Sequence, residues 1–273
     1  MVANYIKKIE IDSLWNGRKR ISWQLNSEVN ILSGVNGMGK TTILNRVVDS
    51  LHRLNKRHAD KSDGTAVTLT FSPEEADEVR YDVVRSFDNT MIPASIAQKL
   101  TDGLIRSELD WNLYELQRRY LDYQVNIGNR MIEILSSGGA DAHQEAMQVS
   151  KAKTDFHDTI DTLFSETHKT IDRSSNELMF VQYGERLSPY RLSSGEKQML
   201  IILLTVLLQN RQPYVLLMDE PEASLHVEWQ QRLVGIIRRM NPNVQIILTT
   251  HSPALIMDGW LDSVTEVSDI VVG

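Results

Sequence analysis

Apolar positions in the first 85 residues recur at short intervals that predict β-strands leading into a glycine-rich segment. Two later groups alternate apolar and polar residues with a period of two, and we expect these to pair as a hairpin. Between the glycine-rich segment and this hairpin, a helix is expected from about Thr41 to Leu54. The apolar positions are Ile6, Ile9 and Ile11, then Ile21, Trp23 and Leu25, then Val29 and Ile31, and for the hairpin Val67, Leu69 and Phe71 with Val79, Tyr81 and Val83.

From about residue 93 to 172 the pattern changes to that of helices. Six apolar residues are spaced 4, 3, 4, 3 and 4 apart, which places them on one face of one helix. A turn is expected at 136–141, followed by a second, more polar helix from about 142 to 168. The apolar face could pair with another protein, but at under three heptads we expect it to pack on its own lobe. The six residues are Leu109, Leu113, Leu116, Tyr120, Tyr123 and Ile127.

After Leu178 strands alternate with helices, which is typical of a parallel sheet with crossover helices. The chain shows no repeats, low-complexity tracts or linkers. We therefore expect one α/β domain over residues 1–273, with a mixed N-terminal β-subdomain, a parallel core sheet and a helical insertion at about 93–172. The expected elements are strands 178–182, 214–219, 244–250 and 264–271, and helices 194–210 and 225–240.

Composition narrows the class of protein. Among 273 residues, 41% are apolar and 24% charged, as in an ordinary soluble globular protein. The absence of cysteine excludes disulfides and thiolate metal sites and favours the cytoplasm. No signal peptide is apparent, and the longest apolar stretch, near 199–208, is too short to span a membrane. A net charge of −7 argues against a nucleic-acid coat protein, although His52–His58 contains a local basic cluster; a solvated helix end is the favoured interpretation of that cluster.

Residues Gly34–Thr41 fit the Walker A pattern G-x-x-x-x-G-K-[ST], between a predicted strand and a predicted helix. The glycines let backbone N–H groups surround phosphates, and the helix N-terminus adds a positive end. Lys40 should reach the β- and γ-phosphates of ATP, while the Thr41 hydroxyl binds Mg²⁺. The predicted nucleotide-binding residues are Gly34, Asn36, Gly37, Gly39, Lys40, Thr41 and Thr42.

Two acidic residues follow the apolar run that begins at Val215. This run ends in Asp219 and Glu220, the Walker B arrangement of a buried strand that delivers a carboxylate beside the P-loop. Asp219 is predicted to hold Mg²⁺ through water, and Glu220 to orient and polarise the attacking water.

The segment Leu192-Ser-Ser-Gly-Glu-Lys-Gln198 resembles the signature motif of the ABC-type ATPase superfamily. The resemblance implies that Ser193 and Gly195 close over the γ-phosphate held by the opposite subunit, so that ATP joins a head-to-tail homodimer. It also assigns His251, after the apolar run 246–248, the role of the switch histidine that contacts the γ-phosphate.

The segments after Walker B resemble those of the soluble OLD, RecF and SMC-like branch, often labelled AAA-type ATPases. Glu222, His226 and Ser252-Pro253 differ from the usual transporter residues, as do Ser194 and Glu196 in the signature. Many members of this branch are found in genome maintenance or anti-phage defence. OLD nucleases carry a further TOPRIM domain, which we do not expect in the 22 residues after the switch histidine.

The leading hypothesis is a soluble Mg²⁺-ATPase that dimerises on ATP and drives or gates a separate effector, with a nuclease as one candidate. A nucleotide-binding subunit of an ABC transporter and an ATP-gated DNA-binding clamp are the alternatives. Gln98 and Gln182 are weak candidates for the Q-loop glutamine. Trp15 is the best candidate to stack on adenine, with core packing an equal alternative.

Overall fold

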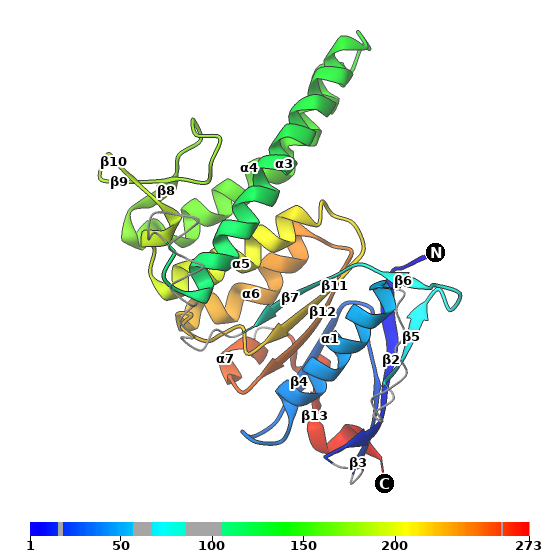
Figure 1. Cartoon of the computed structure of the whole chain (residues 1–273). Coiled ribbons are helices and arrows are strands. Elements are labelled where there is room, and N and C mark those ends of the chain that lie inside the picture. The colour runs from blue at the N-terminus through cyan, green and yellow to red at the C-terminus, as the bar shows by residue number, and fades with distance from the viewer. Residues whose placement is uncertain (16–18, 57–66, 86–104, 258, 273) are drawn as a thin grey trace. The chain divides into compact units, whose positions relative to one another are not determined.

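A parallel sheet of five strands lies at the centre of the first of two units into which the chain divides (Figure 1). The computed structural model describes residues 1–15, 19–56, 67–85, 105–257 and 259–272. The first unit comprises Met1–Ser86 with Arg211–Gly273, and the second comprises Phe87–Asn210.

The strands of the parallel sheet lie in the order β13-β4-β12-β11-β7. All neighbours run parallel, as expected for an α/β fold. Every residue of β12 is buried, because such a sheet is covered on both faces, and this explains its apolar run Ile246–Leu248. The bounds are β4 Val29–Ser33, β7 Tyr81–Arg85, β11 Tyr214–Asp219, β12 Val244–Thr250 and β13 Val264–Glu266.

A second, antiparallel sheet has the order β14-β3-β2-β5. The fully buried Gln245 of β12 joins the two sheets, because its side chain bonds both the N–H and the C=O of Ile6 in β2, at 2.8 Å each. Two short strands, β1 and β6, form a separate parallel pair. The bounds are β1 Val2–Ala3, β2 Tyr5–Leu14, β3 Lys19–Gln24, β5 Val67–Ser72, β6 Glu78–Val79 and β14 Val271–Val272.

Helix α1 (Lys40–Lys56) packs against both sheets of this unit. Its buried Val47, Val48 and Leu51 share one apolar core with residues of β2, β3, β11 and β12. Helix α6 (Val227–Met240) lies on the opposite face of the parallel sheet from α1 (Figure 1), and it is followed after β12 by the short α7 (Pro253–Ile256). Helices therefore cover both faces of the parallel sheet.

Two expectations about strands are wrong. Residues 67–83 do not form a hairpin: β5 pairs with β2, whereas β7 pairs with β11 in the other sheet. The expected strand 264–271 is interrupted by the 3-10 turn η4 (Val267–Ile270), which a capping box between Glu266 and Asp269 stabilises. This turn carries the chain from the parallel sheet into the antiparallel one, so one apolar run serves two sheets.

The described part of the second unit, residues 105–210, contains three longer helices and a small antiparallel sheet of order β10-β9-β8. The predicted helix face is confirmed: Leu113, Leu116, Tyr120 and Tyr123 of α3 are buried. Helix α4 ends at Leu163, earlier than expected, because a 3-10 turn and the left-handed His168 (φ 54°) follow it. The bounds are α3 Glu108–Ser136, α4 Ala142–Leu163, η1 Ser165–Thr167, β8 Lys169–Ile171, β9 Phe180–Gln182, β10 Glu185–Leu187, η2 Pro189–Arg191 and α5 Ser194–Leu208.

Candidate nucleotide site

The glycine-rich loop joins β4 to α1, as the Walker A pattern requires. Gly37 and Gly39 have φ angles of 84° and 89°, a left-handed backbone that glycine adopts without steric cost. The Lys40 ammonium lies within the loop and donates to the carbonyl oxygens of Gly34 and Val35 at 2.8 and 3.4 Å. Its side chain is only 4% exposed, so the loop holds a positive charge at its centre.

The Walker B aspartate lies at the end of β11, next to the start of α1. The Thr41 hydroxyl donates to Asp219 Oδ1 at 3.1 Å, and the Thr249 hydroxyl donates to the same oxygen at 2.5 Å. Thr249 is the register partner of Asp219 across the parallel pair β11–β12. Two hydroxyls therefore fix the carboxylate at the junction of three elements.

Glu220, the next residue, has a left-handed backbone (φ 46°), which is unfavourable for a residue with a side chain. Its N–H donates to the Thr249 side chain and backbone oxygens at 3.2 and 3.1 Å, and these bonds hold the turn. The turn presents the carboxylate to the Lys40 ammonium and the His251 imidazole: Glu220 Oε1 lies 4.0 Å from Lys40 Nζ and 3.3 Å from His251 Nδ1. Glu220 therefore lies between Lys40 and His251.

A buried carboxylate ties the segment after Walker B to the end of β12. Glu222, which is 5% exposed, accepts hydrogen bonds from the Thr250 hydroxyl and from the His251 N–H, the latter at 3.3 Å. Ser252 continues the link, because its hydroxyl donates to Gln230 Oε1 of α6 at 2.7 Å. Sequence reasoning noted Glu222 as a family marker but did not foresee this contact with the histidine segment.

Trp15 lies directly against the phosphate-binding loop. A β-carbon placed on Gly39 would come within 2.2 Å of the Trp15 ring, so only glycine fits beside it. The indole is 38% exposed, and Lys19 Nζ lies 5.7 Å from its centroid. The edge of the indole packs on the Gly39 backbone, and the side chain is partly exposed beside the loop.

The signature segment belongs to the second unit. Ser193 is the N-cap of α5 and forms a capping box with Glu196: Glu196 N–H donates to Ser193 Oγ at 3.3 Å, and Ser193 N–H donates to Glu196 Oε2 at 2.9 Å. Ser193 and Ser194 are exposed, whereas Gly195 is buried.

Glu196 is only 3% exposed, and its carboxylate accepts hydrogen bonds from several residues around this segment. Lys169 Nζ bonds both its oxygens at 2.8 and 3.0 Å, and the Thr167 hydroxyl donates to Oε1 at 2.8 Å. Burial alone would raise the pKa of Glu196, but these hydrogen bonds and those from Ser193 outweigh it and hold the pKa below its ordinary value. The carboxylate is thus ionised and clamps the N-terminus of α5.

The next residue anchors α5 to α3. Lys197 Nζ forms an ion pair with Asp110 Oδ1 at 2.7 Å, and the other oxygen of Asp110 accepts the N–H groups of Arg106 and Ser107 at 3.0 and 3.1 Å. One buried carboxylate therefore caps α3 and holds the signature helix.

The structure brings Lys40, Thr41, Asp219, Glu220 and His251 together in the first unit. Asn36 and Gly37 are exposed in the loop, and Thr42 is exposed in the first turn of α1, while Gly34 begins the loop. The remaining candidates are the two glutamines considered for the Q-loop and the basic cluster. Of the two candidates for the Q-loop glutamine, Gln182 donates to the Thr167 carbonyl at 2.9 Å, and Gln98 lies outside the described residues. The described part of the basic cluster includes His52, whose Nδ1 lies 2.6 Å from the Tyr81 hydroxyl.

Three observations fit ATP with Mg²⁺. The left-handed glycines and the helix N-terminus form a concave set of N–H donors suited to phosphates. The Lys40 ammonium occupies the inside of the loop, where it donates to two carbonyl oxygens that a phosphate could replace. Thr41 and Asp219 supply one hydroxyl and one carboxylate, a donor set typical of Mg²⁺ that also binds substrate phosphates.

Comparison with known proteins gives the family context. A family model described as "AAA domain, putative AbiEii toxin, Type IV TA system" matches residues 82–258, which is more than half of the chain. The chain is 25% identical over 172 residues to "Retron Vc95 probable ATPase" of Vibrio cholerae serotype O1 biovar El Tor, a match that covers 58% of this chain and 32% of that protein. It thus spans about a third of that relative's length.

A second relative is matched over most of its length. Septu protein PtuA of Bacillus thuringiensis is 24% identical over 304 residues, covering 92% of this chain and 72% of that protein. Among solved structures, an Smc head bound to the C-winged helix domain of ScpA matches with a TM-score of 0.53 and 14% identity, covering 93% of this chain and 91% of that one. The fold is therefore that of an Smc-type head. In the part of the chain that the structure describes, no helix is long and apolar enough to cross a membrane.

Proposed function

We propose that this chain, which belongs to the AAA-domain family whose model matches it, hydrolyses Mg²⁺-ATP as a head-to-tail homodimer and thereby gates a separate effector protein. Its family, its relatives and its fold make it an ABC-type P-loop ATPase related to Smc heads and to retron and Septu ATPases. Hydrolysis by this chain, the Mg²⁺ dependence, the dimer and the output are the parts that we add.

The observation that carries the proposal is the cluster around Glu220. Its carboxylate lies within 4.0 Å of Lys40 and within 3.3 Å of His251, beside the Thr41–Asp219 pair. In this arrangement Lys40 binds the β- and γ-phosphates, and Glu220 orients and polarises the attacking water. Thr41 and Asp219 would hold Mg²⁺, which supplies neutralisation of the phosphate charge.

His251 is proposed to exchange partners when nucleotide binds. Its Nδ1 lies 3.3 Å from Glu220 Oε1, while its backbone N–H donates to Glu222 Oε1. The imidazole can turn toward the γ-phosphate while the backbone stays in place, since the Glu222 bond fixes only the backbone. This would release the Glu220 carboxylate to accept a hydrogen bond from water.

The dimer is proposed from the exposure and capping of the signature segment. The Ser193 hydroxyl is exposed, and the N-terminus of the 15-residue helix α5 adds a positive end. These are donors for an anion, and we assign them the γ-phosphate bound by a second copy of the chain. Mutual donation by two copies encloses two ATP molecules in a homodimer.

The output is proposed to be the gating of a separate effector, with a nuclease as one candidate, in genome maintenance or anti-phage defence. Many ATPases of the OLD, RecF and SMC-like branch are found in these processes. Similarity to a retron ATPase and to a Septu protein supports this assignment.

Phosphate release from Mg²⁺-ATP, measured over a range of protein concentrations, tests the proposal. If the active species is a dimer, the rate per chain rises with protein concentration until the dimer is saturated. Lys40→Ala should lower that rate about 100-fold or more, because a charge preorganised for the transition state is lost. A rate per chain that is independent of concentration in a monomeric protein would contradict the dimer, and full turnover by Lys40→Ala would contradict the site.

A further inference from the structure

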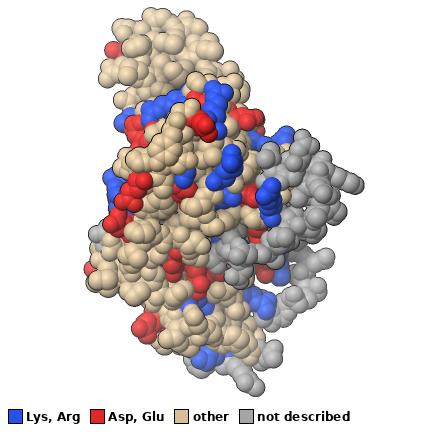
Figure 2. All heavy atoms as spheres, turned by 90° about the vertical axis from the view of Figure 1, so that its left-hand side faces the viewer, with Lys and Arg blue, Asp and Glu red and all other residues tan. Residues whose placement is uncertain are grey.

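Charged side chains on the surface and in the interior of this protein differ in what they can hold in place. On the face that Figure 2 shows, Lys and Arg lie among Asp and Glu, and ion pairs on such an exposed surface contribute little to stability. A buried carboxylate fixes the groups that donate to it, because leaving it without donors costs free energy. Glu222, which follows the Walker B residues and is 5% exposed, belongs to the buried kind.

One oxygen of Glu222 holds the backbone of the histidine segment. Thr250, the last residue of β12, donates from its hydroxyl to Glu222 Oε1, and the His251 N–H donates to the same oxygen at 3.3 Å. The other oxygen, Oε2, is buried and accepts no hydrogen bond from the residues that the structure describes. His251 is the first residue beyond the strand, so the Glu222 side chain supplies the acceptor that its backbone needs there.

These contacts belong to a closed ring of hydrogen bonds that passes through three segments. The Ser252 N–H donates to the Thr250 hydroxyl at 2.9 Å, and the Ser252 hydroxyl donates to Gln230 Oε1 of α6 at 2.7 Å. Gln230 Nε2 donates to the Leu225 carbonyl at 2.9 Å, and the Leu225 N–H donates to the Glu222 carbonyl at 2.9 Å. The Glu222 ring, as it is called below, consists of Glu222, Leu225, Gln230, Thr250 and Ser252.

The His251 side chain is not part of the ring. It is 51% exposed, and its Nδ1 lies 3.3 Å from Glu220 Oε1 and 3.9 Å from Glu222 Oε1. The backbone of this residue is therefore held, while its imidazole can exchange partners by rotation about its own side-chain bonds. This arrangement suits a residue that must reach one defined atom, since a displacement of about 1 Å can cost about 100-fold in rate.

We infer that Glu222 and Thr250 are positioning residues of the ATPase site, which hold the backbone of His251 where its imidazole can reach the γ-phosphate. The inference rests on the proposed function, because that function assigns His251 the contact with the γ-phosphate. Neither positioning residue is assigned a contact with nucleotide, since each acts through the histidine. The phosphate-binding loop contains no member of the ring, so binding of ADP, which lacks the γ-phosphate, should not depend on the ring.

Hydrogen–deuterium exchange of the His251 and Ser252 amides, in the full chain without nucleotide, tests the ring independently of turnover. Glu222→Ala removes the acceptor of the His251 N–H, and Thr250→Val removes the acceptor of the Ser252 N–H with little change of shape. We expect the amide that loses its acceptor to exchange about tenfold faster or more, because exchange follows local opening.

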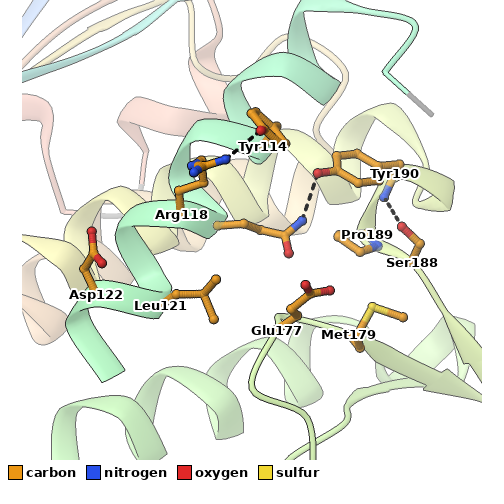
Figure 3. A pocket seen from close by; sticks show the side chains of 10 residues that line it. Tyr114, Arg118, Leu121, Asp122, Glu177, Met179, Ser188, Pro189 and Tyr190 are labelled. Carbon is orange, nitrogen blue, oxygen red and sulfur yellow. Dashed lines mark hydrogen bonds between the residues drawn. The ribbon is translucent and has the colours of Figure 1, made fainter. Parts of the chain in front are cut away.

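Two control variants accompany this measurement. Glu222→Gln keeps one acceptor oxygen at the same place, so both amides should exchange as in the wild type. Tyr114→Phe removes a hydroxyl of the second unit that accepts from Arg118 at 2.7 Å (Figure 3), and it too should leave both amides unchanged. The controls separate loss of the ring from loss of any one hydrogen bond.

Phosphate release at saturating Mg²⁺-ATP tests the positioning role. Glu222→Ala and Thr250→Val should each lower kcat about tenfold or more, because the imidazole is no longer held near its target. The dissociation constant for ADP should stay within about twofold of the wild type, and Glu222→Gln and Tyr114→Phe should retain kcat within about threefold, since the ring remains intact in both controls. In a His251→Ala background, neither disrupting change should lower kcat by more than about twofold further, because the histidine through which they act is absent.

Unchanged exchange in both disrupting variants, with folding checked by circular dichroism, would overturn the ring. Wild-type kcat in these variants, a loss of ADP affinity as large as the loss of kcat, or a further large loss in the His251→Ala background would overturn the positioning role. A wild-type chain that releases no phosphate would instead contradict the proposed function, and the exchange rates would still decide whether the ring holds His251.

Discussion

Removing the carboxylate of Glu196 should destabilise the second unit through a buried charge that loses its partner. In the wild type, Glu196 binds Lys169, Thr167 and the N-cap residue Ser193. The variant Glu196→Ala leaves Lys169, whose side chain is only 12% exposed, without its counter-ion. It also removes one half of the capping box of α5.

The expected cost follows from these contacts. Breaking a buried ion pair by deleting one partner costs about 3–5 kcal/mol. Because Lys169 is slightly exposed and can recover some hydration, we expect the lower end, about 3 kcal/mol. Lys169→Met should cost less, about 2 kcal/mol, since Glu196 keeps two hydrogen bonds to charged oxygen. The double variant should cost at least 1 kcal/mol less than the sum of the two single variants.

Urea unfolding followed by far-ultraviolet circular dichroism measures these differences. The matched control is Lys151→Met, which removes an exposed i, i+4 pair with Asp155 and should cost under about 1 kcal/mol. Because the pKa of Glu196 is lowered in the folded state, its stabilisation is present above the pKa of an unfolded glutamate, about 4.3, and is lost as the pH falls below it. A cost below 1 kcal/mol for Glu196→Ala, or strict additivity in the double variant, would refute this reasoning.

Three further predictions concern other parts of the chain. Gly39→Ala should weaken Mg²⁺-ATP binding at least tenfold in a fluorescent-nucleotide titration, because its φ is 89° and its β-carbon would meet Trp15 at 2.2 Å; Gly235→Ala, with open space around it, is the neutral control. Ser193→Arg should bind nucleotide almost normally but remain monomeric and inactive; full turnover would disprove the assigned role of the signature. Burial lowers the pKa of His157 to about 4. The free energy of unfolding should therefore fall by up to about 3 kcal/mol as the pH falls from 6.5 to 4, because the unfolded histidine binds the proton first. His157→Phe should abolish this dependence on pH.

The parallel sheet was predictable because its central strands are buried on both faces. Strands β11 and β12 have the predicted bounds, 214–219 and 244–250, around the apolar runs Val215–Met218 and Ile246–Leu248. The pairing of other strands was not predictable in this way. A period of two identifies β5 and β7 as strands, but nothing local specifies that one joins the antiparallel sheet and the other the edge of the parallel sheet.

In the site, too, local motifs were predictable from the sequence, whereas contacts that depend on strand register or tertiary packing were not. The loop, Asp219 and Glu220 are local motifs, and the structure brings them together. The bonds of Thr249 to Asp219 and of Thr250 to Glu222 depend on the register of β11 with β12 and on the path of the chain after β11. Hydroxyls at the carboxyl end of a strand next to Walker B are the signal that could have indicated them. The contact of Trp15 with Gly39 likewise depends on tertiary packing across 24 residues of sequence.

The central claim, a site completed by a second copy of the chain, is tested most directly by the mass of Glu220→Gln in Mg²⁺-ATP. Light scattering should show a 31.2 kDa chain that doubles in mass, because slowed hydrolysis preserves the ATP-bound dimer. The double variant Glu220→Gln with Ser193→Arg should remain at the monomer mass under the same conditions. A Glu220→Gln variant that stays monomeric at saturating Mg²⁺-ATP, or a double variant that still dimerises, would contradict the account.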